Sequence, residues 1–148
     1  MSTIDELLQA NESYAASFDR GDLPLPPGRG IAILTCMDAR IIPSRALGLE
    51  EGDAHVIRNA GGRARDALRS LIISQRLLGT REVAVIHHTD CGMLTFNNRD
   101  LRQKVREDIE FLQATQRLDP ETLIRGFVYD VRSGRLREVR VETEAQAG

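Results

Sequence analysis

The sequence predicts an α/β fold in which helices flank a mainly parallel β-sheet of about four strands, with one added antiparallel strand. Short apolar runs alternate along the chain with stretches whose apolar residues recur at helical spacing, and this alternation is typical of parallel α/β sheets. Two of the runs, 31–34 and 83–86, are short and rich in β-branched residues, as buried strands are. Near the end of the chain, residues 132–135 (Arg-Ser-Gly-Arg) are typical of a hairpin turn, which predicts the antiparallel strand.

The elements expected in the first half are a helix over 3–18, a turn-rich connector over 21–28, a strand over 30–35, a short helix over 44–47 and a strand over 53–57. Apolar residues at helical spacing indicate the first helix. The prolines and glycines of the connector exclude both a helix and a central strand there. Pro43 opens the short helix and Gly48 ends it.

The elements expected in the second half are a helix over 66–78, a strand over 82–88, a helix over 100–118 and strands over 123–130 and 136–141. Both helices follow from apolar stripes, and Gly79 is the expected cap of the first. We find no internal repeat and no second domain, so residues 1–148 are expected to form a single domain. The helix and arm over 1–28 must then pack either on that domain or on a second subunit.

The composition limits the classes of function. The 148 residues are 41% hydrophobic and 28% charged, which suits one soluble domain with a buried core. A net charge of -2 gives no reason to expect nucleic acid as a partner. No apolar run approaches the roughly 20 residues that span a bilayer, and the acidic N-terminus does not resemble a signal peptide. We therefore expect a cytoplasmic protein, in which a cysteine pair favours metal binding or catalysis over a disulfide.

Two cysteines and a histidine pair follow the two apolar runs. The first run leads to Cys36, and the second leads to His87, His88 and then Cys91. Because parallel strands end at the same edge of a sheet, these side chains are expected to converge. Thiolates and imidazoles are preferred ligands of zinc, and three protein ligands leave a fourth position for water, as in catalytic sites. His87 and His88 point to opposite faces of a strand, so only one of them can face the ion.

Asp38 and Arg40 follow the first cysteine at alternate positions. Arg40 can hold Asp38 in a bidentate, charge-assisted pair. Asp38 can then accept a hydrogen bond from a zinc-bound hydroxide and orient it for attack. The carboxylate can instead occupy the open zinc position, so the two arrangements would be an active and an inactive state of one site. His55 has no thiol or carboxylate pattern around it, and we interpret it as structural.

The chain resembles the β-class carbonic anhydrases of the small, single-domain type. The Cys-x-Asp-x-Arg pattern of that family appears as Cys-Met-Asp-Ala-Arg at 36–40, and its His-x-x-Cys pattern appears as His-Thr-Asp-Cys at 88–91. The second match assigns the ligand to His88 rather than His87. Further matches are at 58–61, 69–71 and 125–130, and two segments, 62–67 and 97–124, are shorter than the family pattern.

The resemblance implies one zinc ion per subunit, held by Cys36, His88 and Cys91, with Asp38 and Arg40 as the catalytic residues. It implies reversible hydration of carbon dioxide to bicarbonate, and a homodimer or homotetramer in which the N-terminal arm packs on a neighbouring subunit. Hydrolysis of carbonyl sulfide or carbon disulfide at the same zinc site is one alternative. A non-catalytic protein that binds zinc or senses bicarbonate is the other. We expect a small-molecule substrate and no nucleic-acid or membrane partner.

Overall fold

The structure is a computed structural model that describes residues 1–93 and 100–141, and its centre is a five-stranded sheet. The strands are β1 (Ile31–Cys36), β2 (Ala54–Asn59), β3 (Glu82–His88), β4 (Leu123–Tyr129) and β5 (Leu136–Val139). The helices are α1 (Thr3–Ala16), α2 (Pro43–Leu47), α3 (Ala64–Arg76) and α4 (Leu101–Ala114), and a 3₁₀ turn, η1 (Ala60–Gly62), precedes α3.

The strand order is β2-β1-β3-β4-β5, and every neighbouring pair is parallel except β4 with β5. This confirms the predicted fold class, including the antiparallel strand. The segment 97–124, expected to be shorter than the family pattern, begins with residues that lie outside the described part of the chain. The rest of it forms α4, the turn before β4 and the first two residues of β4. No helix within the described ranges combines the length and the apolar character that crossing a membrane requires.

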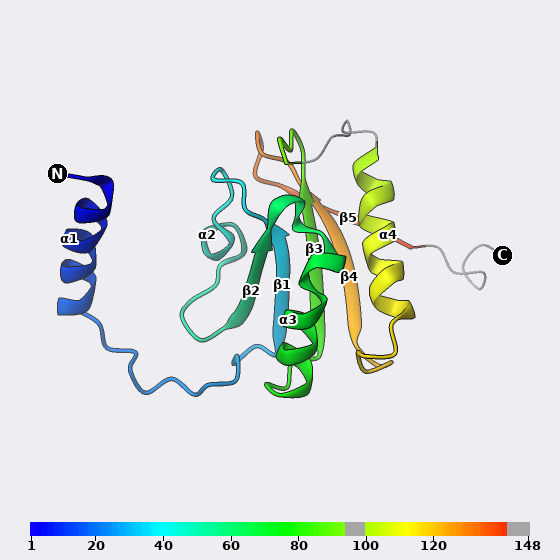
Figure 1. Ribbon diagram of the computed structural model, residues 1–148, viewed down its shortest axis with the longest axis horizontal. Helices are drawn as coiled ribbons and strands as arrows, with labels where there is room; N and C mark the ends of the chain where they lie inside the picture. Colours follow the sequence, from blue (N-terminus) through cyan, green and yellow to red (C-terminus); the bar gives the residue numbers. More distant parts are fainter. Residues whose placement is uncertain (94–99, 142–148) are drawn as a thin grey trace.

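Helices α3 and α4 lie side by side against one face of the sheet (Figure 1). The main core lies between them and the sheet, and its fully buried side chains include Leu34 of β1, Leu71 of α3 and Val85 of β3. Gly126 of β4 allows α4 to approach closely, because a Cβ atom at that position would overlap the side chains of Val105 and Ile109. On the other face, the short helix α2 packs near the carboxyl ends of β1 and β3.

Each of the four helices differs from its predicted bounds at one end or both, and the largest differences are in α3 and α4. Helix α3 begins two residues earlier than expected, at Ala64, because Asp108 of α4 accepts a hydrogen bond from the Ala64 N–H at 3.2 Å. Helix α3 ends at Arg76, two residues earlier than expected, and Leu77 is its C-cap. Gly79 follows in the left-handed conformation typical of a glycine that ends a helix, and its N–H donates to the carbonyl oxygen of Gln75 at 3.1 Å. Helix α4 ends at Ala114, four residues earlier than expected, because the backbone becomes extended at the next residue.

The N-terminal helix α1 stands away from the sheet at the end of a long connector (Figure 1). None of its residues is buried, and the apolar side chains of Ile4, Leu7 and Leu8 are 69%, 64% and 60% exposed. The side chains that link this part of the chain to the body are polar: the Tyr14 hydroxyl donates to Glu51 at 2.8 Å. The expected helix is therefore present, and its apolar side chains are not covered by its own domain.

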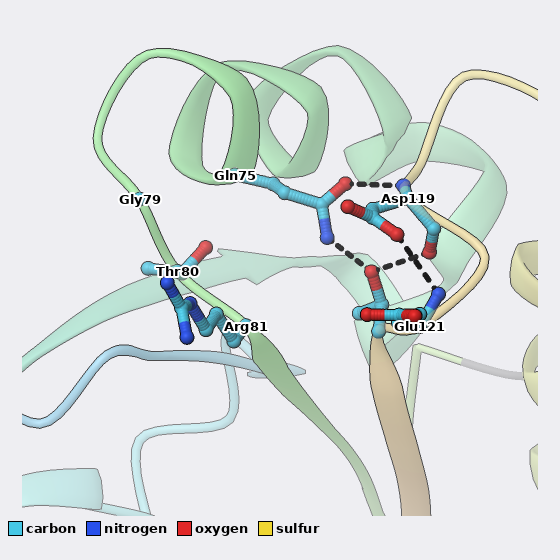
Figure 2. A pocket seen from close by; sticks show the side chains of 7 residues that line it. Gln75, Gly79, Thr80, Arg81, Asp119 and Glu121 are labelled. Atoms are coloured by element: carbon cyan, nitrogen blue, oxygen red, sulfur yellow. Dashed lines mark hydrogen bonds between the residues drawn. The ribbon is translucent and has the colours of Figure 1, made fainter.

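The two ends of the sheet differ in character. At the amino ends of β3 and β4 lies an open polar cavity of about 540 Å³, lined by Gln75, Arg81, Asp119 and other polar residues (Figure 2). At the carboxyl ends of β1 and β3, by contrast, buried thiol and imidazole groups converge. The carboxyl edge is where parallel sheets carry their chemistry, so the candidate site lies there.

Candidate metal centre

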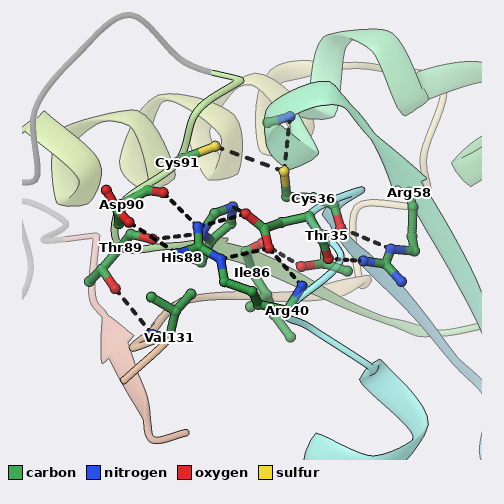
Figure 3. A network of polar contacts seen from close by, with 12 residues as sticks. Thr35, Cys36, Arg40, Arg58, Ile86, His88, Thr89, Asp90, Cys91 and Val131 are labelled. Atoms are coloured by element: carbon green, nitrogen blue, oxygen red, sulfur yellow. Dashed lines mark hydrogen bonds and ion pairs between the residues drawn. The ribbon is translucent and has the colours of Figure 1, made fainter. Parts of the chain in front are cut away.

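Cys36, His88 and Cys91 come together at the carboxyl edge of the sheet, with one ligand atom from each lying within 4.8 Å of the others. Cys36 is the last residue of β1, His88 is the last residue of β3, and Cys91 lies in the turn that follows (Figure 3). The two sulfurs are 3.8 Å apart and the two cysteines are not joined by a disulfide. Two thiolates bound tetrahedrally to one zinc ion have sulfurs about 3.8 Å apart, so the spacing fits a shared ion.

The histidine is presented in the form that a metal requires. Nδ1 of His88 lies 2.7 Å from the carbonyl oxygen of Thr89, and because a carbonyl can only accept, Nδ1 carries the proton. Nε2 then offers its lone pair toward the cysteines, and it is buried with no hydrogen-bond partner among the described residues. A buried nitrogen without a partner is costly unless something binds it. His87 points away from this cluster and contacts Asp108, so the structure brings His88, not His87, to the thiols.

The turn η1 brings a backbone donor to the first cysteine. The N–H of Gly61 donates to Sγ of Cys36 at 3.4 Å. Gly62 lies so close to β1 that a Cβ atom there would be 2.8 Å from the carbonyl carbon of Thr35. Both glycines adopt positive φ, which side chains disfavour. The pair of glycines therefore places an N–H dipole where it stabilises a negatively charged sulfur.

Asp38 and Arg40 form the bidentate pair expected from their spacing. Arg40 donates from Nε to Oδ1 of Asp38 at 3.0 Å and from Nη2 to Oδ2 at 2.8 Å. These hydrogen bonds lower the pKa of the Asp38 carboxyl to about 2, although burial opposes the change. Oδ2 of Asp38 lies 3.8 Å from Nε2 of His88, so the carboxylate borders the cluster, and Arg40 holds it. Of the two arrangements expected from the sequence, the bidentate pair is the one in which Asp38 would orient a zinc-bound hydroxide.

Two further residues hold the turns that follow β1 and β3, and no role was expected for either from the sequence. Asp90 accepts from Nη1 of Arg40 at 3.0 Å, so Arg40 bridges the turn after β3 to the turn after β1. Arg58 of β2 donates to the carbonyl oxygens of Cys36 and Asp38, each at 2.8 Å. Arg58 lies in a stretch that matches the family pattern, and that match was the signal available. His55 contacts Ser74 instead of the cluster, which agrees with its structural interpretation.

The fold and the cluster together define a class of protein. A mainly parallel α/β sheet carries two thiols and one imidazole at its carboxyl edge, beside a carboxylate–arginine pair, and these three groups could hold one metal ion. The family model described as carbonic anhydrase matches residues 31–123. The chain is 44% identical to beta-carbonic anhydrase 1 of Mycobacterium tuberculosis, a match that covers 94% of this chain and 99% of that protein. The chain belongs to the β-carbonic anhydrase family.

Other relatives give the range of the family. A solved carbonic anhydrase from Glaciozyma antarctica superimposes with a TM-score of 0.85 at 48% identity, covering 95% of this chain and all of that one. A carbon disulfide hydrolase of Acidianus is 41% identical over 66% of this chain, and the match spans 47% of that protein. The sequence similarity to these two carbonic anhydrases thus extends over nearly the full length of both chains, whereas the sequence similarity to the Acidianus hydrolase covers part of each. A solved carbon disulfide hydrolase superimposes over 98% of this chain and 94% of its own, with a TM-score of 0.68 at 26% identity.

Proposed function

We propose that this protein is a zinc-dependent carbonic anhydrase, which converts carbon dioxide and water reversibly into bicarbonate and a proton. The observation that carries the proposal is the convergence of Cys36, His88 and Cys91 beside a carboxylate that Arg40 holds in place. The 3.8 Å spacing of the sulfurs and the unpartnered Nε2 of His88 fit one zinc ion with three protein ligands.

Cys36, His88 and Cys91 would hold the ion, and zinc bound in this way supplies a Lewis acid that makes water acidic enough to attack carbon dioxide near neutral pH. The chain's own groups orient the reaction. Asp38 would accept a hydrogen bond from the attacking water and direct its lone pair. Arg40 keeps that carboxylate ionised and turned toward the site. The Gly61 N–H withdraws charge from the Cys36 sulfur, which keeps the site more electrophilic.

The test combines zinc content with hydration rate. Cys36→Ala, His88→Ala and Cys91→Ala should each lose stoichiometric zinc by elemental analysis, whereas His55→Ala, which removes the histidine outside the cluster, should keep it. Zinc-loaded wild-type protein should hydrate carbon dioxide in a stopped-flow assay with a pH indicator. Activity should disappear on treatment with a chelator and return with zinc. Full zinc content in all three ligand variants would overturn the site assignment.

The alternative substrates call for the same assay on three gases. The partial similarity to a carbon disulfide hydrolase makes carbon disulfide and carbonyl sulfide the relevant competitors. We expect turnover of carbon dioxide to exceed that of both. A zinc-loaded protein inert toward all three gases from acidic to alkaline pH would instead identify a non-catalytic zinc-binding or bicarbonate-sensing protein.

We also propose that the protein is a homodimer, or a tetramer built from dimers, in which residues 1–28 pack on the neighbouring subunit. The exposed apolar side chains of α1 and the long connector support this, because such a surface favours a partner. A second copy of the chain is the occupant that we propose. The two cysteines of the cluster form no disulfide, which favours a reducing compartment such as the cytoplasm, since a disulfide would abolish the site.

A further inference from the structure

A buried carboxylate joins the segments that carry Cys36 and His88. Asp108 of α4 is only 3% exposed and occupies the apolar stripe of its helix, next to Ile109. It accepts from Nη2 of Arg63 at 2.9 Å and from Nε2 of His87 at 3.0 Å. It also accepts from the N–H of Ala64 at 3.2 Å, which caps α3. The carboxylate thus ties α4 to the start of α3 and to the end of β3.

Asp108 and the groups that donate to it form a junction between the helices and the sheet. One series of contacts from this junction leads to Cys36. Arg63 exchanges two hydrogen bonds with Asn59: its N–H donates to Oδ1 at 2.9 Å, and its carbonyl accepts from Nδ2 at 3.0 Å. These bonds close the turn over 59–63. The same turn carries Gly61, whose N–H donates to Sγ of Cys36. A displacement of Arg63 would therefore move the backbone donor away from the sulfur.

A second series of contacts leads from Asp108 to His88. The ring of His87 is fully buried on the helix-covered side of β3, and Asp108 holds it there. Successive residues of a strand point to opposite faces. Holding His87 on the helix-covered face therefore also keeps His88 on the opposite face. Asp108 thus acts through Arg63 and His87, and it restrains the backbone that presents two of the three groups of the cluster.

We propose that Asp108 is a positioning residue of the metal centre, which holds the Gly61 donor against Cys36 through Arg63 and fixes the end of β3 through His87. The inference rests on the proposed zinc site. A carboxylate buried in the apolar stripe of a helix is poor at stabilising a fold, since well-packed apolar residues do at least as well there. Its partners, Arg63 and His87, belong to the two segments that carry Cys36 and His88. Residues that hold metal ligands in position affect the affinity for the metal.

The test measures zinc affinity in the full-length protein, by competition with a chelator of known affinity. Asp108→Asn keeps the shape of the side chain but removes its charge and one acceptor. We expect its zinc dissociation constant to rise by about 10–100-fold. In the cobalt-substituted protein, the sulfur-to-cobalt charge-transfer band should shift, because the Gly61 donor is displaced from Cys36. Arg63→Lys, which loses the forked contact but keeps the charge, should weaken zinc binding by a smaller factor in the same direction.

The matched control is Leu112→Ala, which leaves a cavity in the core one helical turn from Asp108 and removes none of the hydrogen bonds that Asp108 accepts. It should lower the thermal unfolding midpoint and leave zinc affinity and the cobalt spectrum unchanged within about two-fold. An unchanged zinc affinity in both Asp108→Asn and Arg63→Lys would overturn the inference and leave the proposed function intact. So would an equal loss of affinity in Leu112→Ala. Wild-type protein that binds no zinc would overturn both proposals.

Discussion

At the scale of single residues, the cluster depends on backbone groups as much as on side chains. The carbonyl of Thr89 sets the tautomer of His88, and the N–H of Gly61 reaches the sulfur of Cys36. Arg40 then divides its donors between Asp38 and Asp90, which fixes the carboxylate beside the cluster. Substitutions that leave the ligands in place can therefore still change the chemistry of the site.

The first prediction separates the role of Asp38 from metal binding. Asp38→Asn should retain stoichiometric zinc and lose at least about 100-fold in the rate of carbon dioxide hydration, because an amide no longer accepts on both sides from Arg40 or from the attacking water. Stopped-flow rates on zinc-quantified protein measure this. Asp53→Asn, which changes a carboxylate that caps a turn at the amino edge of the sheet, is the control and should keep the wild-type rate. A wild-type rate in Asp38→Asn would remove Asp38 from the mechanism.

A second prediction concerns the close approach of the glycine turn to β1. Gly62→Ala places a Cβ atom 2.8 Å from the carbonyl carbon of Thr35 and 2.9 Å from the nitrogen of Cys36, at a φ of +67°. We expect the free energy of unfolding to fall by about 2–5 kcal/mol, from backbone strain and overpacking together. Gly79→Ala has a similar φ and open space around the new atom, so it should lose only about 1–2 kcal/mol. Urea unfolding compares them, and equal losses would refute the steric argument.

At the scale of elements, the site is held by helices that pack closely on the sheet. Asp108 of α4 supplies the cap of α3, and burial by itself would raise the pKa of this carboxyl. The hydrogen bonds from His87 and Arg63 outweigh burial and hold that pKa below its usual value. The carboxylate therefore remains ionised at neutral pH. The contact between α3 and α4 is thus an ionic junction at one end and an apolar core along its length.

The third prediction tests the contact of α4 with β4. Gly126→Ala introduces a Cβ atom that overlaps the side chain of Val105 and lies 2.6 Å from Cδ1 of Ile109. We expect a loss of about 1–3 kcal/mol in the free energy of unfolding, measured with urea. Val105→Ala removes one of the overlapping atoms. The loss of free energy of unfolding in the double variant should therefore be about 1 kcal/mol smaller than the sum of the losses in the two single variants. Strict additivity would mean that the helix moves away without cost.

At the scale of the whole molecule, the described chain has a compact sheet domain and an N-terminal helix with exposed apolar side chains. Leu7 and Leu8 lie next to each other on α1, and Leu25 in the connector is 80% exposed. A monomer would present all of these groups to water. A second copy that covers them would give the connector its purpose, because it lets the helix reach across to a neighbour.

The fourth prediction follows from that arrangement. Leu7→Glu/Leu8→Glu should raise the dissociation constant of the dimer by at least about 100-fold, because two leucines lose their burial and two charges are added to the interface. Sedimentation velocity at micromolar concentration measures the change. Gln9→Glu/Ser13→Glu adds the same charge on the opposite face of the helix and should leave the dimer intact. Wild-type protein that sediments as a monomer would contradict the proposed assembly.

How much of the site the sequence predicts depends on whether the information is local. Cys36, Cys91 and the strands that lead to them could be identified because apolar runs and ligand types are local features. The Asp38–Arg40 pair could be predicted because two alternate residues suffice to form it. The residues alone left His87 and His88 open, since alternation on a strand excludes one but does not say which face holds the thiols. The roles of Arg58 and Asp90 involve segments that meet only in the folded chain.

The sequence by itself determined the fold class, the strand that leads to each cysteine and the residue types at the site, because hydrophobic periodicity and side-chain chemistry act over a few residues. The tertiary structure alone decided that helix α3 starts at Ala64, where a carboxylate 44 residues away caps it. It also decided that a glycine N–H reaches a sulfur and that a buried aspartate joins two helices and a strand. These contacts form only when distant segments pack together, so no local pattern encodes them.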